Sequence, residues 1–250
     1  MKIKLTAKRD FRCFKKDSAY ELDLRPGEIT FMVGDNGCGK SSIMLALRSK
    51  LDSLAESDNK NSDGMRKMSL MMHYLDVKTG FEIEGFEFDK AFFRDTVIDN
   101  PTSFLNSATA YGLVMGGGLS AQRKSAGQVN VEQIVRFISD IVETLGDHSD
   151  ERILIGIDEL DDSLCIRSQL HQVHIMSELL LKRYPNASIL YISHSIVSAL
   201  GMVAHPEIPC RCYDMPNNCY CDPVDYFRQE TGFDIKLYKH VDNEHQKENR

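Results

Sequence analysis

The sequence predicts an α/β fold in which a mostly parallel sheet is flanked by helices and carries a small helical lobe. Two apolar runs, residues 152–157 and 188–193, have the continuous hydrophobicity of strands buried on both faces of a parallel sheet. A segment with strong helical periodicity precedes them, covers residues 134–145 and ends at Gly146. The third observation is a glycine-rich loop at residues 34–41, between an apolar run and the start of a helix. Strands that alternate with helices in this way indicate a parallel sheet with helical crossovers.

The glycine-rich loop reads Gly-Asp-Asn-Gly-Cys-Gly-Lys-Ser and fits the phosphate-binding pattern G-x-x-x-x-G-K-[ST] in full. Its glycines let the backbone adopt positive φ, so that N–H groups can point at phosphate oxygens. Lys40 is expected to reach the β- and γ-phosphates of a nucleotide, and the Ser41 hydroxyl to coordinate Mg²⁺. A chance match in a flexible loop is the alternative, but the strand predicted over 28–33 and the helix predicted from residue 42 supply the required context. The expected nucleotide contacts are Gly34, Asp35, Asn36, Gly37, Cys38, Gly39, Lys40, Ser41 and Ser42.

Two acidic residues, Asp158 and Glu159, follow the apolar run 152–157. Carboxylates at the C-terminal end of such a strand lie beside the phosphate loop of the same sheet. Asp158 is expected to hold the Mg²⁺ shell, usually through water, and Glu159 to orient and polarise the attacking water. A solvated strand end is the alternative explanation for one acid, but this pair coincides with a phosphate loop.

A histidine and a second loop complete the candidate site. His194 follows the run 188–193 and is placed to donate a hydrogen bond to a γ-phosphate, although a lone histidine there is also commonly structural. Residues 124–128 read Lys-Ser-Ala-Gly-Gln and precede the periodic helix. Ser125 and the N–H groups around Gly127 are therefore expected to form an anion site at a helix N-terminus.

In their order along the chain, at residues 34–41, 124–128, 158–159 and 194, the four elements resemble the ABC-type ATPases, which are P-loop NTPases. Residues 124–128 resemble a degenerate form of the LSGGQ signature, residues 160–164 resemble the D-loop, and His194 resembles the switch histidine. Residues 10–14 and 20–24, upstream of the loop, resemble the start of RecF, SMC and related DNA-repair ATPases. By this resemblance Arg12 lies near the nucleotide.

The resemblance implies an ATPase that acts as an ATP-dependent homodimer. Ser125 would complete the site of a second copy, so that ATP is sandwiched between two protomers. The implied partner is DNA or a nuclease, in repair or in phage–host conflict. Two other functions stay open: the nucleotide-binding subunit of a membrane transporter, and a nucleotide-gated interaction module with little turnover.

One feature departs from the ABC pattern. These ATPases usually carry a glutamine between the phosphate loop and the signature, and no glutamine occurs between residues 41 and 121 of this chain. The nearest candidates for its place are Asp95, Asp99 and Asn100. An ionised carboxylate can coordinate Mg²⁺ but cannot donate a hydrogen bond, so the role of this loop stays open.

Composition agrees with a cytoplasmic enzyme. The chain has 250 residues, of which 42% are apolar and 27% charged, as in an ordinary globular domain. A single domain over 1–250 is expected, with residues 65–119 as the lobe insert and residues 240–250 as a disordered tail. No run approaches the roughly 20 apolar residues of a membrane span, so no membrane association is expected.

The charge distribution bears on the partner. A net charge of −7 argues weakly against general nucleic-acid binding, whereas the first sixteen residues are strongly basic. That cluster is either a phosphate-binding face or an ordinary solvated face. Its members are Lys2, Lys4, Lys8, Arg9, Arg12, Lys15 and Lys16.

Four of the seven cysteines form two C-x-C pairs that are separated by six residues. Alternation along a strand would place each pair on one face, and residues 214–218 are expected to turn the chain between them. Four thiolates could then bind Zn²⁺, although the spacing is not a common zinc pattern. Ordinary buried thiols are the favoured alternative for Cys210, Cys212, Cys219 and Cys221.

Overall fold

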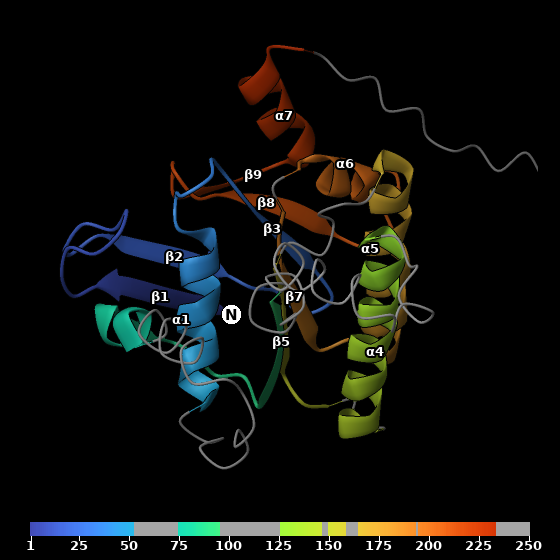
Figure 1. The fold of residues 1–250 in the computed structure, drawn as a ribbon, viewed down its shortest axis with the longest axis horizontal. Coiled ribbons are helices and arrows are strands. Elements are labelled where there is room, and N and C mark those ends of the chain that lie inside the picture. The colour runs from blue at the N-terminus through green and yellow to red at the C-terminus, as the bar shows by residue number, and fades with distance from the viewer. Residues whose placement is uncertain (53–74, 96–125, 147–149, 159–164, 194, 234–250) are drawn as a thin grey trace, which may run out of the picture.

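The computed structural model describes residues 1–52, 75–95, 126–146, 150–158, 165–193 and 195–233. These residues form three layers. A central sheet lies between helices on one side and, on the other, a helix with a small second sheet (Figure 1). The described part therefore has the predicted α/β fold, with a mostly parallel sheet flanked by helices.

The central sheet has six strands in the order β5-β6-β7-β3-β8-β9. The first five are parallel to their neighbours, and β9 is antiparallel to β8. The chain passes from β7 through α6 to β8, so that β3 lies between two strands that come much later in the sequence. The strands are β3 (Ile29–Val33), β5 (Lys90–Asp95), β6 (Ile153–Asp158), β7 (Ala187–Ile192), β8 (Cys210–Asp214) and β9 (Cys219–Cys221).

The second sheet is antiparallel and has the order β2-β1-β4. Its strands are β1 (Lys2–Ala7), β2 (Ala19–Asp23) and β4 (Phe81–Glu84). β1 alternates exposed and buried residues, as expected for a strand with one face on a core. This sheet packs beside α1 (Lys40–Asp52) and places the N-terminal segment close to the phosphate loop.

Four further labelled helices follow α1, besides a short helical segment at residues 75–80. α4 (Ala126–Leu145) and α5 (Ile166–Arg183) lie side by side on the face of the central sheet opposite α1 (Figure 1). α6 (Val197–Val203) contacts α5, and α7 (Pro223–Thr231) contacts β8. None of the described helices combines the length and the apolar composition that crossing a membrane requires.

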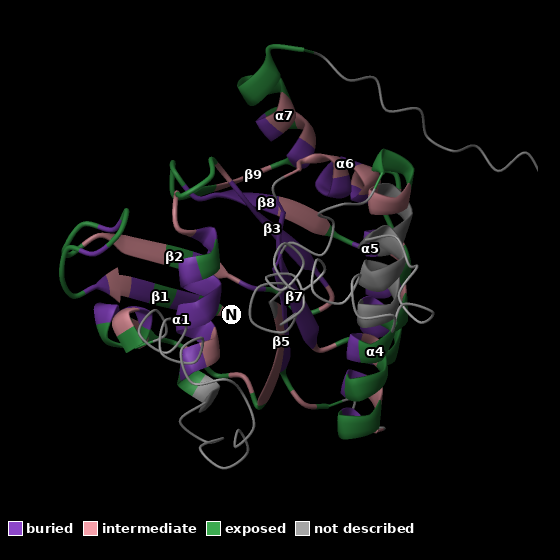
Figure 2. Ribbon diagram, in the orientation of Figure 1, coloured by how far each residue is buried: buried purple, intermediate pink, exposed green. Residues whose placement is uncertain are grey.

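The central strands are buried on both faces, which explains their unbroken hydrophobicity (Figure 2). In β3, Ile29 and Phe31 belong to the core beneath α4 and α5, whereas Met32 belongs to the core beneath α1. At Gly156 of β6, α1 and β5 pack closely around the strand. A side chain there would overlap Phe93 and would lie 2.5 Å from Sδ of Met44.

The three predicted strands appear within one residue of their expected bounds, and α4 ends at Gly146 as predicted. The turn at residues 215–218 joins β8 to β9, also as predicted. The lobe expected over 65–119 is described only at residues 75–95. These comprise a helical segment (75–80), β4 and β5, which join the two sheets. The remainder of that range and the tail 240–250 lie outside the described residues.

Candidate functional site

The phosphate loop connects β3 to α1 at the C-terminal edge of the central sheet. Gly34, Gly37 and Gly39 have φ of 134°, 83° and 107°. Residues with a side chain rarely adopt such φ values, so glycine is needed for the loop to take this conformation. The loop ends as the Ile43 N–H donates to the Gly39 carbonyl at 3.0 Å and the helix begins. This arrangement directs a helix N-terminus at the space above the loop, which is a favourable place for phosphate.

Gly39 also has a packing role. A Cβ at this position would overlap the ring of Phe14 and would lie 2.8 Å from Sγ of Cys13. Phe14 is fully buried and contacts Phe11 and Phe81, with ring centroids 5.1 and 4.8 Å away. The aromatic cluster therefore holds the turn at residues 11–14 directly on the phosphate loop.

Lys40 is 4% exposed, although it carries a charge. Its ammonium donates to the carbonyl oxygens of Gly34 at 2.7 Å and of Asp35 at 3.0 Å. Those bonds point the charged group into the curve of the loop, where the motif requires a cation for the β- and γ-phosphates. The side chain is thus held by the backbone that would cradle the phosphates.

The two serines at the start of α1 differ in exposure. Ser41 is exposed, so its hydroxyl is accessible to a metal ion, whereas Ser42 is 4% exposed. Arg12 donates from Nη1 to the Ser42 hydroxyl at 3.4 Å and has a positive φ of 51°. The structure therefore brings Arg12 to the N-terminus of α1, close to the loop.

Asp158 ends β6 and is 4% exposed. In the sheet register it lies opposite Ile192 at the end of β7, and opposite Asp95 at the end of β5. β7 in turn borders β3, from which the loop leaves the sheet. A buried carboxylate at this edge, together with the Ser41 hydroxyl and the Lys40 ammonium, fits an Mg²⁺-bound nucleotide.

The phosphate loop also contacts the turn after β8, which the sequence did not predict as part of the site. A Cβ on Gly34 would lie 2.5 Å from Cδ of Pro216. The Met215 N–H donates to the Val33 carbonyl at 3.0 Å, and this bond ties the turn to the end of β3. The loop is therefore packed between the aromatic turn on one side and the β8–β9 turn on the other.

Several predicted residues lie outside the described ranges: Glu159, His194, Ser125, Asp99 and Asn100. Their neighbours are placed as the sequence predicts. Glu159 follows the last residue of β6, and His194 follows Ser193 just beyond β7. α4 begins at Ala126, so the Gly127 backbone lies in the first turn of that helix.

The cysteine hairpin forms as predicted, with Cys212 opposite Cys221 and Cys219 opposite Asp214. Cys212 is buried, whereas Cys219 is exposed. Within the described ranges, the four thiols do not form a group whose ligand atoms all lie within 4.8 Å of one another. Burial raises the pKa of Cys210 and of Cys221 to about 12, and it raises the pKa of Cys212 as well. Ordinary buried thiols stay the favoured prediction for these four residues.

Thiol reactivity tests this interpretation. Cys165 is exposed at the N-cap of α5, and the Ser168 hydroxyl 3.2 Å away and the Ser168 backbone lower its pKa. A larger thiolate fraction at pH 7–8 should make iodoacetamide modify Cys165 well before Cys210, Cys212 and Cys221. Peptide mass spectrometry over time measures this order, with urea-unfolded protein as the control in which the difference disappears. Early labelling of Cys212 would contradict the hairpin packing.

The chain matches a known protein family over most of its length. Residues 9–176 match the AAA domain family. No curated protein sequence matches the chain. Among solved structures, cbiO1 from Clostridium perfringens, part of the ABC transporter complex cbiONQ, is 14% identical, with 91% of each chain covered and a TM-score of 0.43. Stu0660 of Streptococcus thermophilus is 13% identical, with 77% of this chain and 69% of that chain covered and a TM-score of 0.40.

Proposed function

Because the chain belongs to the AAA domain family, we propose that it is an ABC-type ATPase of the RecF- and SMC-like branch, which uses Mg²⁺ and forms an ATP-sandwiched dimer. One observation carries the proposal. A complete phosphate loop, with Lys40 buried and turned into its curve, lies at the same sheet edge as the buried Asp158. Different residues are then proposed to carry out different parts of the reaction.

The loop and α1 provide binding and charge stabilisation. Lys40 and the backbone N–H groups at the start of α1 face the phosphates, where negative charge develops during transfer of the γ-phosphoryl group. Ser41 and Asp158 would hold Mg²⁺, which neutralises phosphate charge when it is bound. Arg12 lies close enough to the start of α1 to add a further positive charge.

Two residues beyond strand ends are proposed to act on the attacking water and on the γ-phosphate. Glu159 follows Asp158, so it orients the water and accepts its proton as the water attacks in line. His194 follows β7, which lies between β6 and β3, so it is assigned to the γ-phosphate. The position of both strand ends at the loop edge supports these roles.

The dimer is proposed from the second candidate anion site. Ser125 directly precedes α4, and Gly127 lies in its first turn, so that both are at a helix N-terminus. α4 covers the sheet face opposite α1. We assign this helix end to the nucleotide of a second copy, as the resemblance of residues 124–128 to the ABC signature implies.

The basic N-terminus supports DNA as the macromolecular partner. Lys8, Lys15 and Lys16 are exposed, and no carboxylate among the described residues lies within ion-pairing distance of them. Arg9, in contrast, is paired with Asp76. The three lysines flank the turn that rests on the phosphate loop, so that DNA bound to them would lie near the nucleotide.

ATP turnover tests the proposed function directly. The wild-type chain should hydrolyse ATP, and single-stranded or duplex DNA at low salt should change the rate. Changing Lys8, Lys15 and Lys16 together to glutamine should flatten the dependence of DNA affinity on salt, by up to about one unit of slope for each lysine that binds a phosphate. Lys182→Gln, on the distant α5, is the matched control. Turnover without any DNA binding would exclude DNA as the partner, and ATP binding without turnover would favour the interaction module instead.

A further inference from the structure

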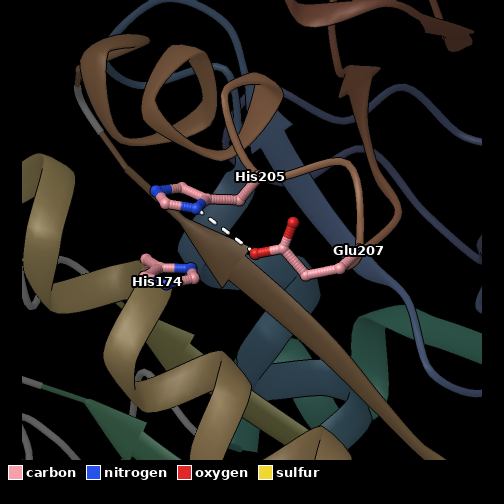
Figure 3. Close-up of side chains that lie close together, drawn as sticks. All are labelled: His174, His205 and Glu207. Atoms are coloured by element: carbon pink, nitrogen blue, oxygen red, sulfur yellow. Dashed lines mark ion pairs between the residues drawn. The ribbon is translucent and has the colours of Figure 1, made fainter. Parts of the chain in front are cut away.

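A group of three metal-binding side chains lies outside the phosphate site. His174 of α5 meets His205 and Glu207, which belong to the connection between α6 and β8 (Figure 3). One potential ligand atom from each residue lies within 4.8 Å of those from the other two. Within the described residues this is the one group of three or more His, Cys, Asp or Glu side chains with such spacing.

The distances suit a small transition-metal ion. Nδ1 of His205 and Oε1 of Glu207 are 3.3 Å apart. Two ligands about 2.0–2.1 Å from a tetrahedral Zn²⁺ are themselves separated by roughly 3.3 Å. The carboxylate of Glu207 points toward the two imidazole rings (Figure 3), and Glu207 itself is exposed.

The imidazole rings are stacked, with centroids 3.5 Å apart and planes 12° from parallel. An ion binds a ring nitrogen close to the plane of that ring, so coordination by both requires the rings to tilt apart. His205 can move because it is 36% exposed, whereas His174 is only 15% exposed and is fixed on α5. Metal binding would therefore move His205, on the α6–β8 connection, relative to a helical ligand that stays in place.

A second carboxylate is placed to orient His174. Oε2 of Glu178, one helical turn further along α5, lies 3.6 Å from Nε2 of His174. The Lys182 ammonium pairs with the other oxygen of this carboxylate, Oε1. Carboxylates that contact the second nitrogen of a ligating histidine fix its orientation and raise its basicity.

We infer that His174, His205 and Glu207 bind a divalent transition-metal ion of the Zn²⁺ class, with Glu178 supporting His174. Two imidazoles and a carboxylate select such ions over Mg²⁺ and Ca²⁺, which prefer oxygen ligands. Three protein ligands leave a fourth position for water.

The connection that carries two of the ligands leads into the N-terminus of β8, whereas the phosphate loop lies at the C-terminal edge of the sheet. This site is therefore separate from the Mg²⁺ proposed for ATP, and it would join α5 to the α6–β8 connection.

Metal titration of the full chain tests the inference. Protein stripped with EDTA and supplied with saturating Mg²⁺ should bind one Zn²⁺ by calorimetry, and its melting temperature should rise with Zn²⁺ concentration. Changing His205 or Glu207 to glutamine should weaken this binding at least about tenfold, and Glu178→Gln should weaken it by about 10–100-fold through its effect on His174. The control is Glu230→Gln on α7, which replaces an exposed acid outside the group and should leave affinity unchanged.

Cobalt identifies the ligands if a variant folds poorly. Co²⁺ bound to histidine and carboxylate lacks the intense near-ultraviolet absorption of cobalt thiolates, which would reveal binding at the cysteine hairpin. Visible Co²⁺ bands without that absorption, lost in His205→Gln, would support the site. Thiolate absorption, unchanged affinity in the His205 and Glu207 variants, a preference for Ca²⁺, or no binding would each overturn it.

Discussion

Replacing Lys40 with alanine should abolish tight ATP binding. The ammonium is the cation that the motif assigns to the β- and γ-phosphates, and it is buried among the carbonyl oxygens of Gly34 and Asp35. In the variant these oxygens would face the phosphates with no intervening positive charge. Truncating one partner of a buried, hydrogen-bonded charge pair costs about 2–5 kcal/mol of binding, or roughly 30- to 5,000-fold in affinity. Fluorescent-nucleotide titration with Mg²⁺ measures the loss.

The control for this experiment is Lys50→Ala, because Lys50 is an exposed lysine in the last turn of the same helix. It should bind nucleotide as the wild type does. Circular dichroism of both variants separates removal of the ammonium from misfolding of the chain. If Lys40→Ala binds ATP with wild-type affinity, the assignment of this loop to phosphate binding is wrong, and the proposed function is wrong with it.

The Glu159→Gln variant should hydrolyse ATP at least about 100-fold more slowly than the wild type, the order of effect of a positioned general base. Glutamine keeps the size of the side chain but cannot accept a proton from water. ATP binding should survive, because Lys40, Ser41 and Asp158 are unchanged. Blocked turnover should then accumulate an ATP-dependent dimer, which sedimentation with and without Mg·ATP detects.

Two further variants make the result specific. Glu143→Gln replaces an exposed acid on α4 and should hydrolyse ATP normally. Adding Ser125→Arg to Glu159→Gln should prevent the dimer, since it places a large side chain just before α4, at the proposed interface. Wild-type turnover by Glu159→Gln would assign the base to another group. A monomeric variant with ATP bound would exclude the sandwich but would leave the phosphate site intact.

The parallel sheet and the phosphate loop were predictable because each has a strong local signal. β3, β6 and β7 read as unbroken apolar runs since both of their faces are covered. The second sheet was not predicted, although β1 alternates between buried and exposed residues. Its lysines suggested only a charged cluster, and one of its partners, β4, lies far along the chain, so that no local pattern indicates the pairing.

The phosphate site was likewise predictable only in part. The motif specified Gly34, Lys40 and Ser41, but nothing in it indicated that Phe14 would rest on Gly39 or that Pro216 would border Gly34. The histidine group could not be predicted for the same reason. Contacts of this kind depend on how distant elements pack, and sequence periodicity does not report them.

The aromatic turn has a consequence for communication within the molecule. Phe14 touches Gly39, and Lys15 and Lys16 follow it directly in the chain. A polymer that binds these lysines and displaces the Phe14 ring would alter the curl of the phosphate loop through one intervening contact. Thermodynamic reciprocity then requires that ATP change the affinity for that polymer by the same factor by which the polymer changes the affinity for ATP. The first sixteen residues would thus couple the binding of an external polymer to the binding of the nucleotide.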